Sequence, residues 1–235
     1  MTGRRSQPDT PLPPAPMLEL LLPKARRGRQ THILCLGAHC DDIDIGCGGT
    51  LLKLLARGDP CQVTWVVFSS NAERARELRA SARRFLRGAS QSRVIAHEFR
   101  DTYFPAEYAG IKDTFQSLKD LPAPDLVFTH HRADLHQDHR IVAELTWNAF
   151  RRHLILEYEI PKYEGGLATP NAYVQLTRAQ AEAKARSLLA CYATQRAKPW
   201  FTAATFTGLM RLRGIEAGPG TGWAEAFHVS KFCIA

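Results

Sequence analysis

The sequence predicts an α/β protein with a single domain, in which a mostly parallel sheet carries helices on both faces. Short apolar runs rich in β-branched residues alternate with longer segments of helical spacing over residues 31–235, and this alternation is typical of βαβ units. The first and the fourth apolar run each end in a cluster of histidines and carboxylates, where open α/β sheets place their chemistry. A chain of 235 residues has room for one such domain with a sizeable core.

The N-terminal part begins with a tail and continues into the first strand. Residues 1–30 include six prolines and predict a flexible tail, because such a segment cannot hold a regular element. Residues 32–38 are nearly all apolar, as expected for a parallel strand buried on both faces. The glycines within 46–49 predict a tight turn after this strand, and residues 50–57 have helical spacing.

The central part continues the alternation of strands and helices. A β-branched and aromatic run at 61–68 predicts the second strand, and the charged, alanine-rich segment 71–86 predicts an amphipathic helix. Shorter apolar runs at 94–99 and 125–129 predict the third and fourth strands. A helix is expected between them at 110–118.

The C-terminal part completes the sheet. Residues 138–152 predict a helix, residues 154–160 a strand and residues 177–192 a long helix. The segment 208–222 is rich in glycine and bears arginines, which favours a loop. Residues 226–234 predict a closing strand.

Composition limits the classes of function. The net charge of +8 would suit an acidic partner, but the basic residues of the tail and of 74–87 are expected to be solvated. They are not interleaved with aromatics, so nucleic-acid binding is not expected. No apolar run approaches the roughly 18 residues of a membrane span, and no apolar segment follows the basic start. We therefore expect no membrane span, a cytoplasmic location and, in the absence of C-x-x-C spacing, reduced cysteines.

The two polar clusters together predict a metal site. Imidazole and carboxylate ligands suit zinc, and a catalytic zinc site keeps three protein ligands. His39, Asp42 and His139 can supply these three ligands if the two strand ends converge. Asp41 is adjacent to Asp42, so the two side chains diverge, which leaves Asp41 to act as a general base.

The motif A-H-C-D-D-I-D-I-G-C-G-G-T-L at 38–51, together with H-x-D-H at 136–139, resembles the PIG-L/LmbE family of metal-dependent N-deacetylases. The first motif of that family is A-H-P-D-D followed by a G-C-G-G-T-like turn. The resemblance covers residues 32–150, and the rest more loosely. It implies a Rossmann-like α/β deacetylase domain over 31–235, which removes an N-acetyl group from an amino sugar or a sugar conjugate.

The resemblance also implies roles for single residues. It makes His39, Asp42 and His139 the zinc ligands and Asp41 the general base. It makes a protonated His136 the group that polarises the amide oxygen, with Asp138 as the residue that orients it. Iron(II) and other divalent ions can use the same ligand set. The expected ligand is a small N-acetylated sugar or glycoconjugate, anionic ones included, while the substrate and the oligomeric state stay open.

Two departures from the family pattern lie inside the first motif. Cys40 stands where the family has proline, and Ile43 stands where an acidic residue often follows the aspartate pair. The thiol of Cys40 either turns toward the core or binds the metal as a thiolate, which would suppress activity.

Several alternatives remain open at this point. A catalytically silent binding module would keep the fold without chemistry, and a metal-dependent phosphoesterase would usually need a second ion and more carboxylates. The segment 130–134 either lines the substrate site or forms an ordinary polar loop. Lys162, Arg211 and Arg213 either meet a phosphate of the substrate or are solvated surface charges.

Overall fold

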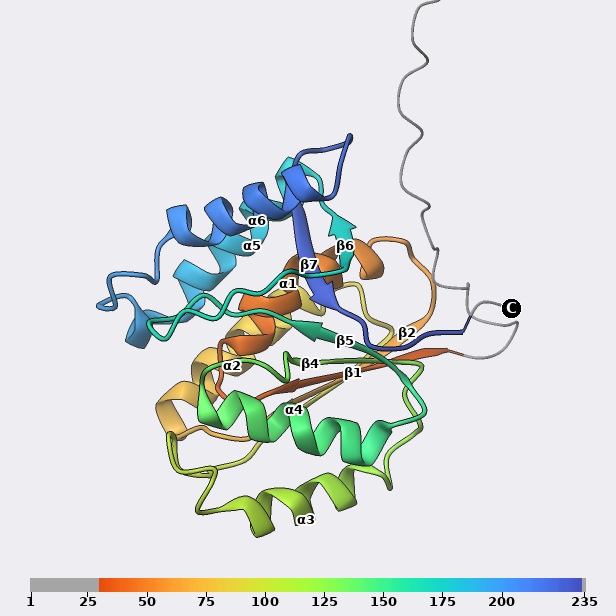
Figure 1. The fold of residues 1–235 in the computed structure, drawn as a ribbon, viewed down its shortest axis with the longest axis vertical. Coiled ribbons are helices and arrows are strands. Elements are labelled where there is room, and N and C mark those ends of the chain that lie inside the picture. Colours follow the sequence, from red (N-terminus) through yellow and green to blue (C-terminus); the bar gives the residue numbers. More distant parts are fainter. Residues whose placement is uncertain (1–29, 234–235) are drawn as a thin grey trace, which may run out of the picture.

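A seven-stranded sheet in the order β3-β2-β1-β4-β5-β7-β6 separates two layers of helices (Figure 1). The computed structural model describes residues 30–233, so the predicted tail at 1–30 lies almost wholly outside the described residues. The strands are β1 Thr31–Gly37, β2 Cys61–Val67, β3 Gln91–Ala96, β4 Leu126–His130, β5 Leu154–Tyr158, β6 Ala172–Gln175 and β7 Ala224–His228. The helices are α1 Asp42–Leu55, α2 Ala72–Phe85, α3 Tyr108–Leu118, α4 Gln137–Phe150, α5 Arg178–Cys191 and α6 Ala203–Glu216, with a 3-10 turn at Ala193–Gln195.

The first five strands are parallel, which confirms the predicted fold class. Strand β1 pairs with β2 on one side and with β4 on the other. The chain therefore winds outward from β1 in one direction and from β4 in the other, which makes their carboxyl ends the switch point of the sheet. Strand β7 runs antiparallel to both β5 and β6.

Alternate residues of each buried strand feed two cores, one on each face of the sheet. In β1, Ile33 and Cys35 join the core that includes residues of α1, α2 and α5. Leu34 and Leu36 join the core that includes residues of α3 and α4. Helices cover both faces, as predicted, and none in residues 30–233 is long and apolar enough to cross a membrane.

The glycines of the first motif lie inside a helix, so the predicted turn at 46–49 is wrong. Helix α1 begins at Asp42, much earlier than the expected residue 50. A Cβ at Gly46 would collide with the ring of Tyr158, and one at Gly48 would lie 2.7 Å from the ring of Phe85. The glycines therefore serve close packing of the helix against the sheet and α2 rather than a reversal of the chain.

The predicted loop at 208–222 is also wrong over most of its length. Helix α6 occupies 203–216, and Thr202 caps it by accepting the N–H of Thr205 at 3.1 Å. Phe206, Met210 and Arg213 are buried at helical spacing, a pattern that the glycine content of the segment obscures. Strand β6 was not predicted, and β3 and β7 each begin a few residues earlier than expected.

Candidate metal centre

Three predicted ligands meet at the carboxyl ends of β1 and β4. His39 follows β1, Asp42 is the first residue of α1, and His139 lies in the first turn of α4. His39 Nδ1 lies 3.3 Å from Asp42 Oδ2 and 3.3 Å from His139 Nε2. His139 Nε2 lies 3.5 Å from Asp42 Oδ1. The two short distances to Asp42 use different carboxylate oxygens, but one donor atom from each of the three residues lies within 4.8 Å of the other two. Zinc ligands at about 2.0–2.1 Å in a tetrahedron are themselves roughly 3.3 Å apart, so the three side chains lie close enough together to share one ion.

Carboxylates behind the two histidines orient their rings toward the centre. His39 Nε2 lies 2.9 Å from Asp101 Oδ1 and 3.3 Å from Asp138 Oδ2. His139 Nδ1 lies 3.2 Å from Asp134 Oδ2. A carboxylate at one ring nitrogen holds the proton there, which leaves the lone pair of the other nitrogen for a metal. His139 thus presents Nε2 to the centre. Burial lowers the pKa of His39, but Asp42, Asp101 and Asp138 outweigh it and hold that pKa well above its usual value, so a metal at Nδ1 would displace a proton from this ring.

The charge states of the ligands also suit a cation. Burial by itself raises the pKa of Asp42, but the adjacent His139, His130 and His39 outweigh it and hold that pKa well below its usual value. Burial and the neighbouring His130 lower the pKa of His139 to about 3. An ionised carboxylate and a neutral imidazole are the forms that bind metal.

Asp41 lies beside the ligands and is held by an arginine. It is buried at the N-cap of α1, and Arg74 Nη2 donates to its Oδ1 at 2.7 Å. Burial raises the pKa of Asp41, Arg74 opposes this, and the nearby Asp42 adds to it. Sequence reasoning assigned Arg74 to a solvated face, although its position after β2 puts it at the same edge of the sheet.

His136 caps α4, and its ring stands next to those of the ligands. The His136 and His39 ring centroids are 5.0 Å apart. The Asp138 N–H donates to His136 Nδ1 at 3.3 Å, which leaves the ring proton on Nε2. Burial, and then the charge of His39, lower the pKa of His136, which favours the neutral ring over the protonated form that the family resemblance implies.

The carboxylate of Asp138 does not bond to His136, the residue that it was expected to orient. It accepts the N–H groups of Thr102 and Phe104 at 2.7 and 3.3 Å and faces His39 Nε2. These bonds fix the segment after β3 and the ring of His39. The link from Asp138 to His136 runs through its backbone N–H.

The thiol of Cys40 turns away from the ligands. It is buried, and its Sγ donates to the carbonyl of Ser69 at 3.5 Å. Burial raises the pKa of Cys40 to about 12, so the thiol stays protonated at neutral pH. Among the described residues, no cluster of potential metal ligands includes Cys40. Ile43 is fully buried in the core, where a charged residue would lack a partner.

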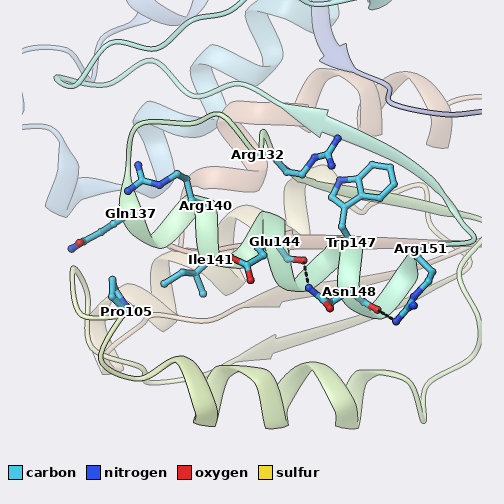
Figure 2. Close-up of a pocket in the computed structure, with 9 residues that line it drawn as sticks. All are labelled: Pro105, Arg132, Gln137, Arg140, Ile141, Glu144, Trp147, Asn148 and Arg151. Atoms are coloured by element: carbon cyan, nitrogen blue, oxygen red, sulfur yellow. Dashed lines mark hydrogen bonds between the residues drawn. The ribbon is translucent and has the colours of Figure 1, made fainter.

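The other candidate residues have structural partners. Arg132 donates to Glu157 at 3.0 Å and lines a groove of about 610 Å³ on the outward face of α4. Figure 2 shows Arg132, Arg140 and Arg151 pointing in different directions, so their guanidinium groups do not converge on one anion. Arg213 binds the buried Glu159 through two bonds of 2.6 Å. The guanidinium of Arg211 covers the ring of Trp223, 5.1 Å from its centroid.

Two neighbouring groups of side chains overlap the predicted ligand set. One combines His130, Asp134 and His139, and the other combines His39, Asp101, His136 and Asp138. Lys162 Nζ lies 2.8 Å from Asp134 Oδ2, so a cation already occupies that side of the first group. Asp101 was not predicted as a site residue. Asp134 and Lys162 were considered only as possible substrate contacts, and the structure instead pairs them with each other behind His139.

Comparison with known proteins gives matches over most of the chain. The sequence profile of the family described as PIG-L, GlcNAc-PI de-N-acetylase, matches residues 34–150. The uncharacterized deacetylase YaiS of Escherichia coli (strain K12) is 30% identical over 143 residues, which cover 57% of this chain and 76% of YaiS.

Two solved structures share the fold at low sequence identity. N,N'-diacetylchitobiose deacetylase from Pyrococcus horikoshii matches with a TM-score of 0.64 and 22% identity, over 85% of this chain and 83% of that chain. GalB, the 4-carboxy-2-hydroxymuconate hydratase from Pseudomonas putida KT2440, matches with a TM-score of 0.68 and 15% identity, over 88% and 98%. One is a deacetylase and the other a hydratase, so the shared fold does not by itself set the reaction.

Proposed function

This chain belongs to the PIG-L family of deacetylases, and on that premise we propose that it is a metal-dependent hydrolase. Residues 31–235 would remove an N-acetyl group from an amino sugar or a sugar conjugate. The observation that carries the proposal is the set of three donors on His39, Asp42 and His139, which lie close enough together to share one ion. Asp41 and His136 stand beside this set with the properties of a base and a hydrogen-bond donor.

Zinc is the metal that the ligand types favour, and iron(II) is the runner-up. A zinc ion held by these residues would lower the pKa of a water from about 15.7 toward about 7 and would polarise the amide carbonyl. The carboxylates at His39 and His139 support this assignment, because such partners hold metal ligands in one orientation.

Asp41 takes the proton of the attacking water. Arg74 holds Oδ1, which leaves Oδ2 to accept the proton and fixes the direction of that lone pair. The raised pKa of Asp41 suits a general base, since its conjugate acid then holds the proton long enough to deliver it to the departing amine. The water supplies its oxygen to the acetyl carbon, the carbon–nitrogen bond breaks, and the amine leaves protonated.

His136 stabilises the negative charge that develops on the amide oxygen. Its neutral ring carries a proton on Nε2 and donates it as a hydrogen bond. Loss of one such donor typically costs about 2.7–4 kcal/mol of transition-state stabilisation. Asp138 contributes by holding the ring through its backbone N–H and by orienting His39.

The alternatives receive less support. A phosphoesterase with two ions would place the second near Asp134, where Lys162 already supplies a positive charge. A silent binding module would have no need of the base and donor geometry around Asp41 and His136.

The test is amine release from a panel of N-acetylated sugars, nucleotide sugars and glycoconjugates by zinc-loaded protein. We expect free amine from at least one of them and a loss of about 100-fold or more in Asp41→Asn. Asp113→Asn, an exposed carboxylate of α3, serves as the matched control and should retain full activity. Zinc-loaded protein that releases no amine, or an Asp41→Asn variant with full activity, would overturn the proposal.

A further inference from the structure

A buried lysine stands behind one of the proposed metal ligands. Only 7% of the Lys162 side chain is exposed, and its Nζ lies 2.8 Å from Oδ2 of the buried Asp134. The same ammonium group donates to the Ile160 carbonyl at 2.8 Å. A charge that is taken out of water is stable only beside an opposite charge, so this ion pair fixes where the ammonium group lies.

Each oxygen of the Asp134 carboxylate faces a different residue of the site. Oδ1 accepts the N–H of His136 at 2.8 Å, and Oδ2 lies 3.2 Å from His139 Nδ1. One carboxylate therefore restrains both the ring of the proposed ligand His139 and the backbone of His136, where α4 is capped. Because Lys162 shares Oδ2 with His139, it restrains the rotation of the carboxylate on which both histidines depend.

The loop that carries Lys162 follows β5 and is clamped to α6. The buried Arg213 donates to both oxygens of Glu159 at 2.6 Å and to the Ala168 carbonyl at 3.1 Å. Glu159 and Ala168 lie on either side of Lys162 in the chain, so one guanidinium group holds both ends of this part of the loop. The bidentate bond is rigid, which leaves the lysine little freedom to move away from its partner.

Another buried lysine pair in the described chain shows what is particular to this one. Lys184 Nζ lies 2.6 Å from Glu225 Oε1. Glu225 otherwise accepts two backbone N–H groups of α1, so that pair holds the main chain of a helix. The carboxylate of Asp134 instead faces the ring nitrogen of His139. The charge of Lys162 is thus connected to the metal position through two side chains.

We propose that Lys162 is a positioning residue of the metal centre, which acts through Asp134 to hold the ring of His139 toward the ion. The inference rests on the proposed function, because it takes His139 as a metal ligand. Without the ammonium group, the buried carboxylate of Asp134 loses the partner that holds it in place. The ring of His139 then loses its fixed orientation, and outer partners of metal ligands contribute about 10–100-fold to metal affinity.

The experiment is a double-mutant cycle on zinc affinity, measured by competition with a chelator of known affinity. Lys162→Met removes the charge and keeps a long side chain, and it should lower zinc affinity about tenfold. In the Asp134→Asn background the same change should have less than about a twofold effect, because the carboxylate through which Lys162 acts is gone. Lys112→Met, at an exposed lysine of α3, should leave zinc affinity unchanged in either background.

Two further measurements separate positioning from a loss of the fold. Urea unfolding in the presence of a chelator shows whether Lys162→Met is folded without metal. The visible spectrum of the cobalt(II)-loaded protein reports the arrangement of the ligands, and it should change in Lys162→Met but not in Lys112→Met. If Lys162→Met does not fold, the cycle is run with Lys162→Gln, which keeps a hydrogen-bond donor without the charge and has the same expected outcome.

Unchanged zinc affinity in the single variant, or equal losses in the two backgrounds, would overturn the inference and leave the metal centre in place. An unchanged cobalt spectrum would also overturn it, because the ligands would then keep their arrangement without the lysine. A wild type that binds no zinc would overturn the metal centre of the proposed function, and this inference with it, so the two failures are distinguishable.

Discussion

Close packing contributes more to one half of the metal centre than to the other. In the first half, residues 38–41 connect β1 directly to α1. The glycines of α1 pack closely against the rings of Tyr158 and Phe85, and this packing fixes the helix. The half after β4 takes the longer segment 131–136, which is fixed by charged and polar pairs. Buried polar contacts also hold α1, since Glu225 accepts the N–H groups of Gly49 and Thr50. The first half should therefore respond to changes of volume and of charge, and the second half mainly to changes of charge.

The pairs of the second half all involve buried carboxylates. Asp134 meets Lys162 and His139, and Glu157 of β5 accepts bonds from Arg132 and Trp147. A buried carboxylate keeps its charge only with such partners, and removal of one partner leaves the other unpaired. The position of the His139 ring therefore depends on these charged pairs, whereas the position of Asp42 depends on how α1 packs against the sheet and α2.

The largest effect is expected from added volume in the first half. Gly46→Ala puts a methyl group into the ring of Tyr158 and should lower the free energy of unfolding by about 2–3 kcal/mol. Gly208→Ala is the matched control, because that helical glycine has open space beside it. It should raise the stability by roughly 0.5–1 kcal/mol. Urea unfolding measures the free energy of unfolding of both variants. Equal changes in the two would show that close packing at Gly46 does not hold α1 in place.

A change of charge in the second half should weaken metal binding. Asp134→Asn removes the carboxylate that faces His139 Nδ1 and should lower zinc affinity by about 10–100-fold. Competition with a chelator of known affinity measures the change. Asp113→Asn, on the exposed surface of α3, should bind zinc like the wild type. An unchanged affinity in Asp134→Asn would show that packing alone orients His139.

The protonation of Asp44 makes the stability of the first half depend on pH. Tyr192 places its hydroxyl 2.6 Å from the Cys40 carbonyl and 2.7 Å from Asp44 Oδ2, and one hydroxyl proton cannot serve both, so a protonated Asp44 supplies the second bond. Burial raises the pKa of Asp44 to about 7. The folded state thus binds a proton that the unfolded chain has already lost, and the stability contributed by neutral Asp44 is lost as pH rises through about 7.

The measurement compares the unfolding free energies of wild type and Asp44→Asn in the presence of a chelator. From pH 6 to 7 the wild type should lose about 1 kcal/mol relative to the variant, which cannot titrate there. A difference that stays constant with pH would mean that Asp44 is ionised throughout.

The smallest effect is expected at Cys40. Because the protonated thiol bonds to Ser69 and not to the metal, Cys40→Ala should change zinc affinity and kcat/KM by less than about twofold. It should cost roughly 1 kcal/mol of stability for the lost buried atoms. A large gain in activity would indicate that the thiol competes for the metal.

The sequence predicted the alternation of strands and helices as far as β5 and the convergence of the donors, because period, composition and motif spacing are local signals. It did not predict the helical glycines of α1, whose reason is the distant ring of Tyr158. It also missed Arg74 and Asp101, whose roles arise from contacts with Asp41 and His39 across the edge of the sheet. Long-range contacts of this kind leave no periodic trace in the chain.

The most direct test of the account is the zinc content of the protein in relation to His139. The wild type should bind one zinc per chain after removal of excess metal. His139→Ala should retain well under half an equivalent and should release no amine. His153→Ala should keep one equivalent, because the ring of His153 bonds the Phe150 carbonyl and packs on the Phe150 ring. Full zinc occupancy in His139→Ala would contradict the ligand set of His39, Asp42 and His139.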